Sequence, residues 1–328
     1  KQRGAFRGGD ALQRCKIVMD RNFLQQLEQV PNRYGDDALL VLQRRAEEGA
    51  KRRFRRLNKA VKYRLAKEFE WIRATNTAKL FLFWADAVAS IKRITYPYDC
   101  SAQNCSLVSY CLGITEVDPL SAGGYFERCL SGDRRLLPVL FIEVPKGRRE
   151  EVWELLEEDW KNFIEIEENA ARPDLPAEAA AAFFARRQSY GDKEILRRAA
   201  ASLGSDASAQ PPETLMDLTE RIVYRRCPEL KDRESWFLYQ EDVIGALVAA
   251  GLSCGEAEGM RRAFAKKNRV EINFYRDILL QRARAAGRSA EETKAVLSAF
   301  ERDTMFTVCR AAYVAMAQYL YMETCLKG

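Results

Sequence analysis

Histidine is absent from the 328-residue sequence. Its absence excludes Ser-His and Cys-His nucleophilic catalysis, histidine acid–base chemistry and every zinc site that uses imidazole. The nine cysteines include no C-x-x-C pair, and Cys100, Cys105 and Cys111 are spaced too widely for a zinc knuckle. We therefore expect reduced thiols without disulfides, no metal site and no cofactor, as is typical of a cytoplasmic protein.

Long apolar runs are also missing. The longest, Leu80–Phe83 and Ile244–Gly251, fall far short of the ~20 residues that a membrane helix requires. The first ten residues contain no apolar segment typical of a secretion signal, and the chain starts without methionine, which suggests a trimmed or partial protein. Hydrophobic residues make up 47% and charged residues 30% of the chain, which favours a globular protein of two or three packed subdomains with no membrane partner.

Acidic residues are scarce in one segment of this chain, whose net charge is +6. Only Glu47 and Glu48 oppose the basic residues between Arg44 and Lys67. Such a run can bind a phosphate backbone, because each neutralised phosphate releases counterions, or it can be the solvated face of two helices. Both interpretations stay open. The basic residues are Arg44, Arg45, Lys51, Arg52, Arg53, Arg55, Arg56, Lys59, Lys62, Arg64 and Lys67.

Periodicity predicts a mostly helical chain. Apolar residues at spacings of three and four predict a helix pair over residues 36–94, which ends at the Tyr-Pro-Tyr that follows Thr95. The apolar run Leu136–Val144 predicts a buried strand, the only convincing one in the sequence. The acid-rich segment 150–166 predicts an amphipathic helix with Trp160 and Phe163 on its apolar side.

The second half contains the strongest linker signal. An alanine-rich stretch to about Leu203 predicts more helix, and Gly204–Pro212 is typical of a linker. After it we expect only helices, with breaks at Cys227-Pro228, Gly251 and Gly287.

Several separated segments follow one another in the order found in a known family. They resemble the alpha subunit of bacterial DNA polymerase III, a C-family DNA polymerase. The most specific match, Ser106–Leu120 with Phe126–Leu130, resembles that family's S-L-V-A-Y-x-L-G-I-T-D-I-D-P-L and F-E-R-F-L. Leu238–Val243 and Gly255–Lys267 resemble L-Y-Q-E-Q-V and G-E-A-D-x-L-R-R-A-M-G-K-K. The segments are Arg64–Ile72, Ala78–Asp86, Ser106–Leu120, Phe126–Leu130, Leu238–Val243, Gly255–Lys267 and, more weakly, Phe306–Tyr313.

This resemblance implies an α+β, predominantly helical fold. It would contain a degenerate polymerase palm, with a small sheet of the nucleotidyltransferase type, and an all-helical fingers-like domain. We expect four regions: an N-terminal extension at 1–35, a palm-like region at 36–145, a helical thumb-like remnant and linker at 146–212, and a helical fingers-like domain at 213–328.

The sequence departs from the family where the chemistry should be. Nucleotidyl transfer needs acidic side chains that hold two Mg²⁺ ions, and the family supplies two of them from P-D-I-D-I-D-F. The matching segment is Pro138–Val144, so Val139 and Phe141 occupy the first two Asp positions and only Glu143 keeps an acid. The family's third motif, V-K-F-D-F-L-G-L, has no match. The resemblance therefore implies no catalytic residues in this chain.

Two further motifs are altered. The family's phosphate-binding loop, G-R-G-S-A-A-G-S, corresponds to Asp99–Ser106, which contains no glycine. Without glycine the backbone cannot approach a triphosphate closely, and Asp99 is expected to add a negative charge. Val308 and Arg310 replace the Lys and His of F-N-K-S-H.

Three functions follow from these observations. The first hypothesis is a catalytically inactive relative that binds DNA or RNA, or serves as a scaffold subunit beside a protein partner in a replication, repair, mobile-element or defence complex. The alternative is an active nucleotidyltransferase with non-standard or partner-supplied metal ligands, and the third is a protein-binding module. Within the first hypothesis the expected nucleic-acid or phosphate contacts are Arg52, Arg53, Arg55, Arg56, Arg261, Arg262, Lys266 and Lys267.

Overall fold

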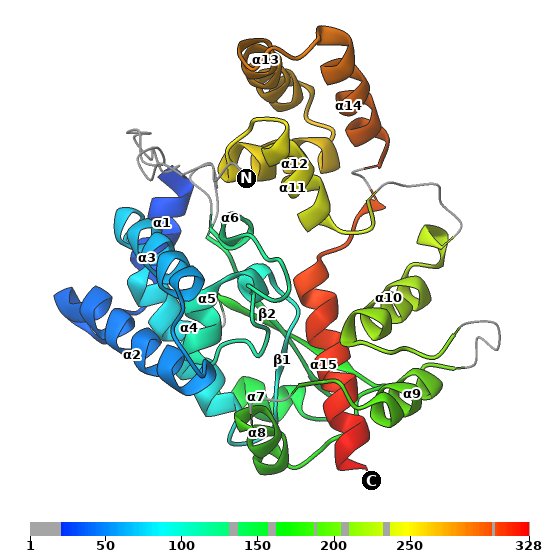
Figure 1. The fold of residues 1–328 in the computed structure, drawn as a ribbon. Helices are drawn as coiled ribbons and strands as arrows, with labels where there is room; N and C mark the ends of the chain where they lie inside the picture. The colour runs from blue at the N-terminus through cyan, green and yellow to red at the C-terminus, as the bar shows by residue number, and fades with distance from the viewer. Residues whose placement is uncertain are drawn as a thin grey trace.

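The computed structural model describes residues 21–130, 137–156, 162–186, 189–204, 210–231, 237–303 and 306–327. In these residues the chain is mostly helical, with one three-stranded mixed sheet in the order β1-β2-β3. The expected α+β, predominantly helical fold class is confirmed. Figure 1 shows the sheet near the middle of the molecule, with helices around it and a separate group of helices at the top.

The first described stretch, residues 21–91, folds into four helices. They are α1 (Arg21–Gln29), α2 (Ala38–Arg53), α3 (Lys59–Ala74) and α4 (Ala78–Ile91), with a short 3-10 turn, η1 (Gly35–Asp37), before α2. The predicted helix pair over 36–94 is thus three helices, because the turn after α2 is followed by Asn58, whose side chain accepts a hydrogen bond from Val61 N and starts α3.

Helix α4 forms the centre of the largest hydrophobic core. Its side chains from Leu80 to Trp84 are all buried, and the Trp84 indole donates to Phe163 O at 3.0 Å. A helix that is apolar around most of its circumference is favoured only where other elements surround those sides. The core therefore fixes the sheet against α4.

The sheet joins segments from separate parts of the chain. Strand β1 (Tyr98–Asp99) pairs antiparallel with β2 (Leu140–Pro145), which pairs parallel with β3 (Ile164–Asn169). Helix α7 (Arg149–Leu155) lies on the crossover between β2 and β3. The predicted strand Leu136–Val144 is confirmed from Leu140 onward, and Leu136 lies outside the described residues.

The amphipathic helix predicted over 150–166 is confirmed up to Leu155, where α7 ends, and is wrong from Ile164 onward. Residues Ile164–Asn169 form β3, and residue 160 lies outside the described part of the chain. In β3 the buried Ile164 and Ile166 alternate with the exposed Glu165 and Glu167. This is the period of two that a strand with one buried face requires, whereas a helix repeats every 3.6 residues.

Short helices connect β1 to β2. They are the 3-10 turn η2 (Ala102–Cys105), α5 (Leu107–Leu112) and α6 (Phe126–Cys129). Helix α5 packs so closely on α2 that a Cβ at Gly49 would lie 1.8 Å from Cys111 O. Only glycine permits this crossing, so α2 and α5 hold the loop before α5 in one position.

A second core lies beside β1. It contains α8 (Ala177–Ala185), α9 (Lys193–Ser202), α10 (Leu215–Arg226) and α15 (Arg310–Leu326), together with Tyr96 and Tyr98. The C-terminal helix therefore returns to the sheet, and Figure 1 shows it running past α10 and α9.

A third core belongs to α11 (Gln240–Ala249), α12 (Cys254–Ala265), α13 (Arg269–Ala285) and α14 (Ala290–Asp303). We call these four helices the upper lobe, after their place in Figure 1. The expected breaks are confirmed, since a 3-10 turn, η4 (Pro228–Leu230), follows α10, and Gly251 and Gly287 follow α11 and α13 with positive φ. Shared cores do not define domains, so the four-region division stays a prediction. None of the helices in the described ranges has both the length and the apolar character needed to cross a membrane.

Candidate functional site

Strand β2 carries the positions at which the polymerase resemblance places metal-binding acids. Val139, just before the strand, is 36% exposed, Phe141 is half-buried and Glu143 is 6% exposed. Side chains at alternate positions of a strand point to one face, so all three lie on the face opposite the core residues Leu140 and Ile142. The first two are apolar and cannot bind Mg²⁺.

Glu143 is held in place by its neighbours. Its Oε2 accepts a hydrogen bond from Asn169 Nδ2 at 2.8 Å, and its Oε1 lies 3.8 Å from Arg226 Nη2. Arg172 Nη1 donates to the Glu143 main-chain oxygen at 2.7 Å. These contacts link β2 to the end of β3 and to α10, and they occupy the carboxylate with protein donors.

Two more acids lie on the same face of the sheet. Glu165 pairs with Phe141 and Glu167 pairs with Glu143 across the parallel ladder, and both side chains are exposed. In the described residues, one group of three Cys, Asp or Glu side chains has all its ligand atoms within 4.8 Å of one another, and it contains none of these glutamates. The sheet acids therefore do not converge into a two-metal site.

The loop at Asp99–Ser106 binds its own polar groups. Asp99 Oδ1 accepts from Ser101 N at 2.7 Å, and Ser101 Oγ accepts from Gln103 N at 3.1 Å. Burial raises the pKa of Asp99 to about 8, because it outweighs the hydrogen bonds from Ser101, which lower the pKa. The expectation that Asp99 adds a negative charge is corrected, because a carboxyl with this pKa is largely protonated at pH 7.

A glutamate occupies the N-terminus of α5. The buried Glu68 accepts hydrogen bonds from Leu107 N and Val108 N, both at 2.9 Å, and from Ser106 Oγ at 2.8 Å. Arg64 pairs with Glu68 at 2.6 Å and also donates to Cys105 O. These amide groups would otherwise be available to a phosphate, so the described loop has no free set of donors that could cradle one.

Four elements meet at a buried arginine that the sequence did not mark as important. Arg128 of α6 donates from Nη1 to Glu241 Oε1 at 2.7 Å and to Cys309 Sγ, and from Nη2 to Gln240 Oε1. Cys105 Sγ lies 4.0 Å from the same Nη1. We call Arg128, Glu241, Cys105 and Cys309 the arginine joint, because they connect α6, α11, η2 and α15.

The charges of the joint balance each other. Burial raises the pKa of Glu241, but Arg128 and the Arg310 amide outweigh that effect and hold the pKa below its usual value. Cys105, Glu241 and Cys309 form the one group with ligand spacing described above. Arg128 Nη1 already contacts the oxygen and the two sulfur atoms of this group, so the guanidinium takes the place that a metal ion would occupy. Its sequence signal was weak: the arginine and the acid each lie inside a family motif, far apart in the chain.

The predicted basic contacts from the α2–α3 segment divide into two kinds. Arg52, Arg55 and Arg56 are exposed. Arg53 instead points inward, pairs with Glu116 at 2.6 Å and stacks on Tyr110 with its guanidinium 4.3 Å from the ring centre. Arg53 therefore stabilises the body of the protein and is not displayed for a ligand.

The predicted basic contacts on α12 divide in the same way. Arg261 is buried and makes two hydrogen bonds to Glu258, at 2.7 and 2.9 Å. Arg262 is half-buried and lies 3.8 Å from the same carboxylate, whereas Lys266 and Lys267 are exposed at the end of the helix. In Figure 1, α2 lies at the lower left and α12 at the top, so the two basic groups are not adjacent.

The altered F-N-K-S-H segment forms a short connection to the upper lobe. Val308 makes an isolated parallel bridge with Tyr239, and Val308 N donates to Leu238 O at 3.1 Å. Arg310 pairs with Asp242 and lies over the Tyr239 ring. Both replaced positions thus have structural contacts.

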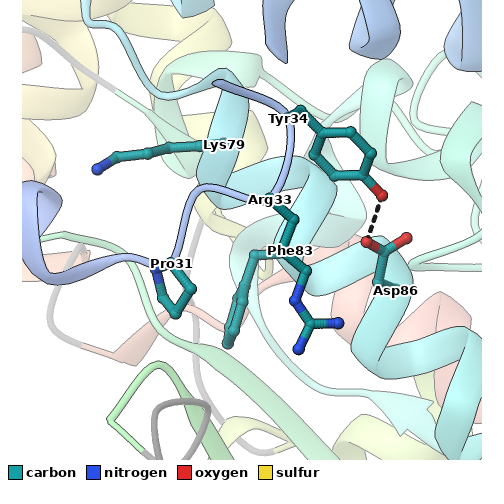
Figure 2. A pocket seen from close by; sticks show the side chains of 6 residues that line it. All are labelled: Pro31, Arg33, Tyr34, Lys79, Phe83 and Asp86. Carbon is teal, nitrogen blue, oxygen red and sulfur yellow. Dashed lines mark hydrogen bonds between the residues drawn. The ribbon is translucent and has the colours of Figure 1, made fainter. Parts of the chain in front are cut away.

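A shallow depression beside α4 is lined by Pro31, Arg33, Tyr34, Lys79, Phe83 and Asp86 (Figure 2). Tyr34 OH donates to Asp86 Oδ2 at 2.6 Å, and Arg45 Nη1 donates to Asp86 Oδ1 at 2.8 Å. Burial and the neighbouring Asp86 raise the pKa of Tyr34. The network ties the segment before α2 to α2 and α4, which is a structural role.

Comparison with known proteins gives partial matches. The family model described as the bacterial DNA polymerase III alpha NTPase domain matches residues 40–173. The chain is 35% identical to the error-prone DNA polymerase of Corynebacterium glutamicum over 131 residues, which cover 37% of this chain and 11% of that protein.

Two shorter matches are closer in identity. The chain is 45% identical over 64 residues to the error-prone DNA polymerase of Bdellovibrio bacteriovorus, and 45% identical over 53 residues to the DNA polymerase III subunit alpha of Yersinia pestis. These stretches cover 20% and 16% of this chain and 6% and 4% of the relatives. The matched part is thus a small fraction of each relative.

Proposed function

Over part of its length the chain is a relative of the bacterial DNA polymerase III alpha subunit and of error-prone DNA polymerases, and we propose that it is a catalytically inactive member of this group that binds nucleic acid as a scaffold subunit. The observation that carries the proposal is the face of β2. It presents Val139 and Phe141, where the family resemblance places two metal-binding acids, and its remaining acid, Glu143, is bound by Asn169.

The chemistry explains why these positions matter. Two Mg²⁺ ions must align the attacking hydroxyl and neutralise the transferring phosphoryl group, and each ion needs carboxylate oxygens. The exposed Glu165 and Glu167 lie on the neighbouring strand, but in the described residues they form no group of three ligands with Glu143. The Glu68 carboxylate at α5 and the hydrogen bonds within Asp99–Ser106 also support the loss of triphosphate binding.

Nucleic-acid binding is the part of the family's function that the surface supports. Arg55 and Arg56 are exposed in the turn between α2 and α3, and Lys59 and Lys62 follow on the exposed side of α3 beside Tyr63, which is 68% exposed. No acid lies between residues 49 and 67. Clustered cations with an exposed aromatic ring are typical of surfaces that contact phosphates and unpaired bases.

The test combines binding and extension on the same samples. Fluorescence polarisation with labelled single-stranded, duplex and primer–template DNA and RNA across a salt series should show salt-dependent binding, and Mg²⁺ with nucleotides should give no extension. The double variant Arg55→Ala/Arg56→Ala should bind more weakly and lower the slope of log K against log salt by up to about 1.8. No binding at low salt would contradict the proposal and favour the protein-binding module.

A matched control removes two cations elsewhere. Lys193 and Arg197 are exposed on α9, away from the α2–α3 turn, so Lys193→Ala/Arg197→Ala should leave the salt slope unchanged. Equal losses in both double variants would mean that net charge alone, and no particular surface, attracts the nucleic acid.

The second candidate is an active nucleotidyltransferase that obtains ligands from a partner chain. Glu165 and Glu167 favour it, because they are exposed beside Phe141 and Glu143 and could join acids from another protein. Magnesium-dependent extension that Glu165→Gln/Glu167→Gln abolishes would support this candidate over the inactive scaffold.

A further inference from the structure

Two cysteines from distant parts of the chain lie together in the arginine joint. The Cys105 and Cys309 sulfur atoms are within 4.8 Å of each other. Cys105 ends η2 and is fully buried, whereas Cys309 precedes α15 and is partly exposed. A disulfide needs sulfur atoms about 2.05 Å apart, so a small side-chain movement would close the bond.

The surroundings favour reaction at Cys309. A hydrogen bond with Cys105 and the charge of Arg128 lower the pKa of the Cys309 thiol, although burial and Glu241 act in the opposite direction. The thiolate is the reactive form of cysteine, and a neighbouring guanidinium stabilises it. Burial instead raises the pKa of Cys111, to about 12, and of Cys254. Among these thiols, Cys309 alone combines a cationic partner, partial exposure and a second thiol.

We propose that Cys105 and Cys309 form an oxidative modification site, which a hydroperoxide of the hydrogen peroxide class converts into a disulfide. This inference goes beyond the proposed function and does not depend on it. The site would take small peroxides, because Cys309 is partly exposed and Cys105 is buried beside it. Disulfides of this kind in reducing compartments are usually transient and redox-sensing.

The reaction has two balanced steps. The Cys309 thiolate attacks one peroxide oxygen, the O–O bond breaks, and the released hydroxide takes a proton to become water, which leaves a sulfenic acid on Cys309. The Cys105 sulfur then attacks the Cys309 sulfur and loses its proton, the S–O bond breaks, and a second water leaves. The two thiols are oxidised by two electrons in total, and the peroxide is reduced to two waters.

The cross-link would join two parts of the second core, because Cys105 and Cys309 both pack in it. Arg128 would lose its contact with Cys309 Sγ but keep Glu241 and Gln240. The bond would hold the start of α15 against η2, next to the connection formed by Tyr239 and Val308. Oxidation should therefore raise the thermal midpoint of the full chain.

The experiment maps the linkage directly. The reduced chain is titrated with hydrogen peroxide, free thiols are blocked with N-ethylmaleimide, and a digest without reductant is analysed by mass spectrometry. We expect a Cys105–Cys309 cross-linked peptide as the first product, loss of two of the nine thiols and full recovery with dithiothreitol. The Cys105→Ser variant should stop at a sulfenic acid on Cys309, which dimedone traps, and Cys309→Ser should leave Cys105 unoxidised.

The Cys254→Ser variant is the matched control, because Cys254 is partly exposed but lies outside the joint. It should form the cross-link at the wild-type dose. A first product that joins other cysteines, direct conversion of Cys309 to a sulfinic acid, or oxidation of Cys254 before Cys309 would each overturn the proposal. The wild-type map decides the question even if a serine variant fails to fold.

Discussion

Two buried carboxyl groups, one before α5 in the chain and one after it, have pKa values that are shifted in opposite directions. Glu116 receives Arg53 Nη1 at 2.6 Å, Lys92 Nζ at 2.7 Å and Tyr96 OH at 2.6 Å. Asp99 has one oxygen bonded by Ser101 N, whereas its other oxygen is buried without a hydrogen-bond partner. The same burial therefore acts on an acid with two cations and on an acid with none.

The pKa values separate accordingly. Burial raises the pKa of Glu116, but Arg53 and Lys92 outweigh it and hold the pKa at about 2. For Asp99 burial is the largest effect, and the pKa rises to about 8. Glu116 is thus a buried charge in a paired network, whereas Asp99 is a neutral hydrogen-bonding group. Of these two acids, only the one beside cations is held in its charged form.

The largest way to break this contrast is to remove the paired acid. Glu116→Ala leaves Arg53 and Lys92 buried without their anion, which should lower the free energy of unfolding by about 3–5 kcal/mol. Urea unfolding at pH 7 measures the change. Glu47→Ala, which removes an exposed acid from α2, should have almost no effect. A loss from Glu116→Ala under about 1 kcal/mol would show that the three contacts contribute little.

The second test uses pH on the unpaired acid. Folded Asp99 keeps its proton up to about pH 8, whereas the unfolded side chain loses it near 3.8. The folded state therefore binds more protons between these values, and stability falls as pH rises through this window. Asp99→Asn should remove that fall and stabilise the chain by on the order of a few kcal/mol at pH 8 and above.

The sign distinguishes the two acids. Glu116 contributes stability that is present above its unfolded pKa of 4.5 and lost as pH falls toward 2. The Asp99→Asn variant should therefore match the wild type near pH 4 and differ from it near pH 8. Thermal melts across pH 4–9 would contradict this interpretation if the variant followed the wild-type curve throughout.

A third test introduces two carboxylates at β2 that would have no cationic side chain to pair with. Val139→Asp/Phe141→Asp restores carboxylates to β2, but Glu143 is already bound by Asn169, so the variant should show no magnesium-dependent extension. Stability should fall by about 1–3 kcal/mol, because Phe141 is half-buried and its replacement brings a polar group without a partner. Extension by this variant would show that two side chains alone separate this chain from an active polymerase.

The smallest expected change is at Glu143. Glu143→Gln keeps an oxygen for Asn169 and loses only the 3.8 Å contact with the partly exposed Arg226, so unfolding should change by about 1 kcal/mol or less. A larger loss, in the range expected for Glu116→Ala, would mean that Glu143 is a paired charge of the Glu116 kind. Chemical unfolding of both variants in one series gives the comparison.

Sequence patterns predicted the helical character, the β2 strand and the breaks at Gly251 and Gly287, because these features depend on local spacing and turn residues. Strand β3 was missed because Phe163 and Ile164 also fit the apolar side of the preceding helix. The charge of Asp99 was misjudged, since burial is a property of the folded chain. The arginine joint could not be predicted, because Arg128 and Glu241 come together only when α6 packs beneath the upper lobe.

The bridge between Tyr239 and Val308 has a topological consequence. The chain enters the upper lobe next to the point where it leaves, and the two crossings are hydrogen-bonded to each other. The lobe is therefore an insertion between α10 and α15, and its hydrophobic core draws almost entirely on its own four helices. Because both connections lie at one place, changes in the length or sequence of this module can leave α15 in its position against α10 and the sheet.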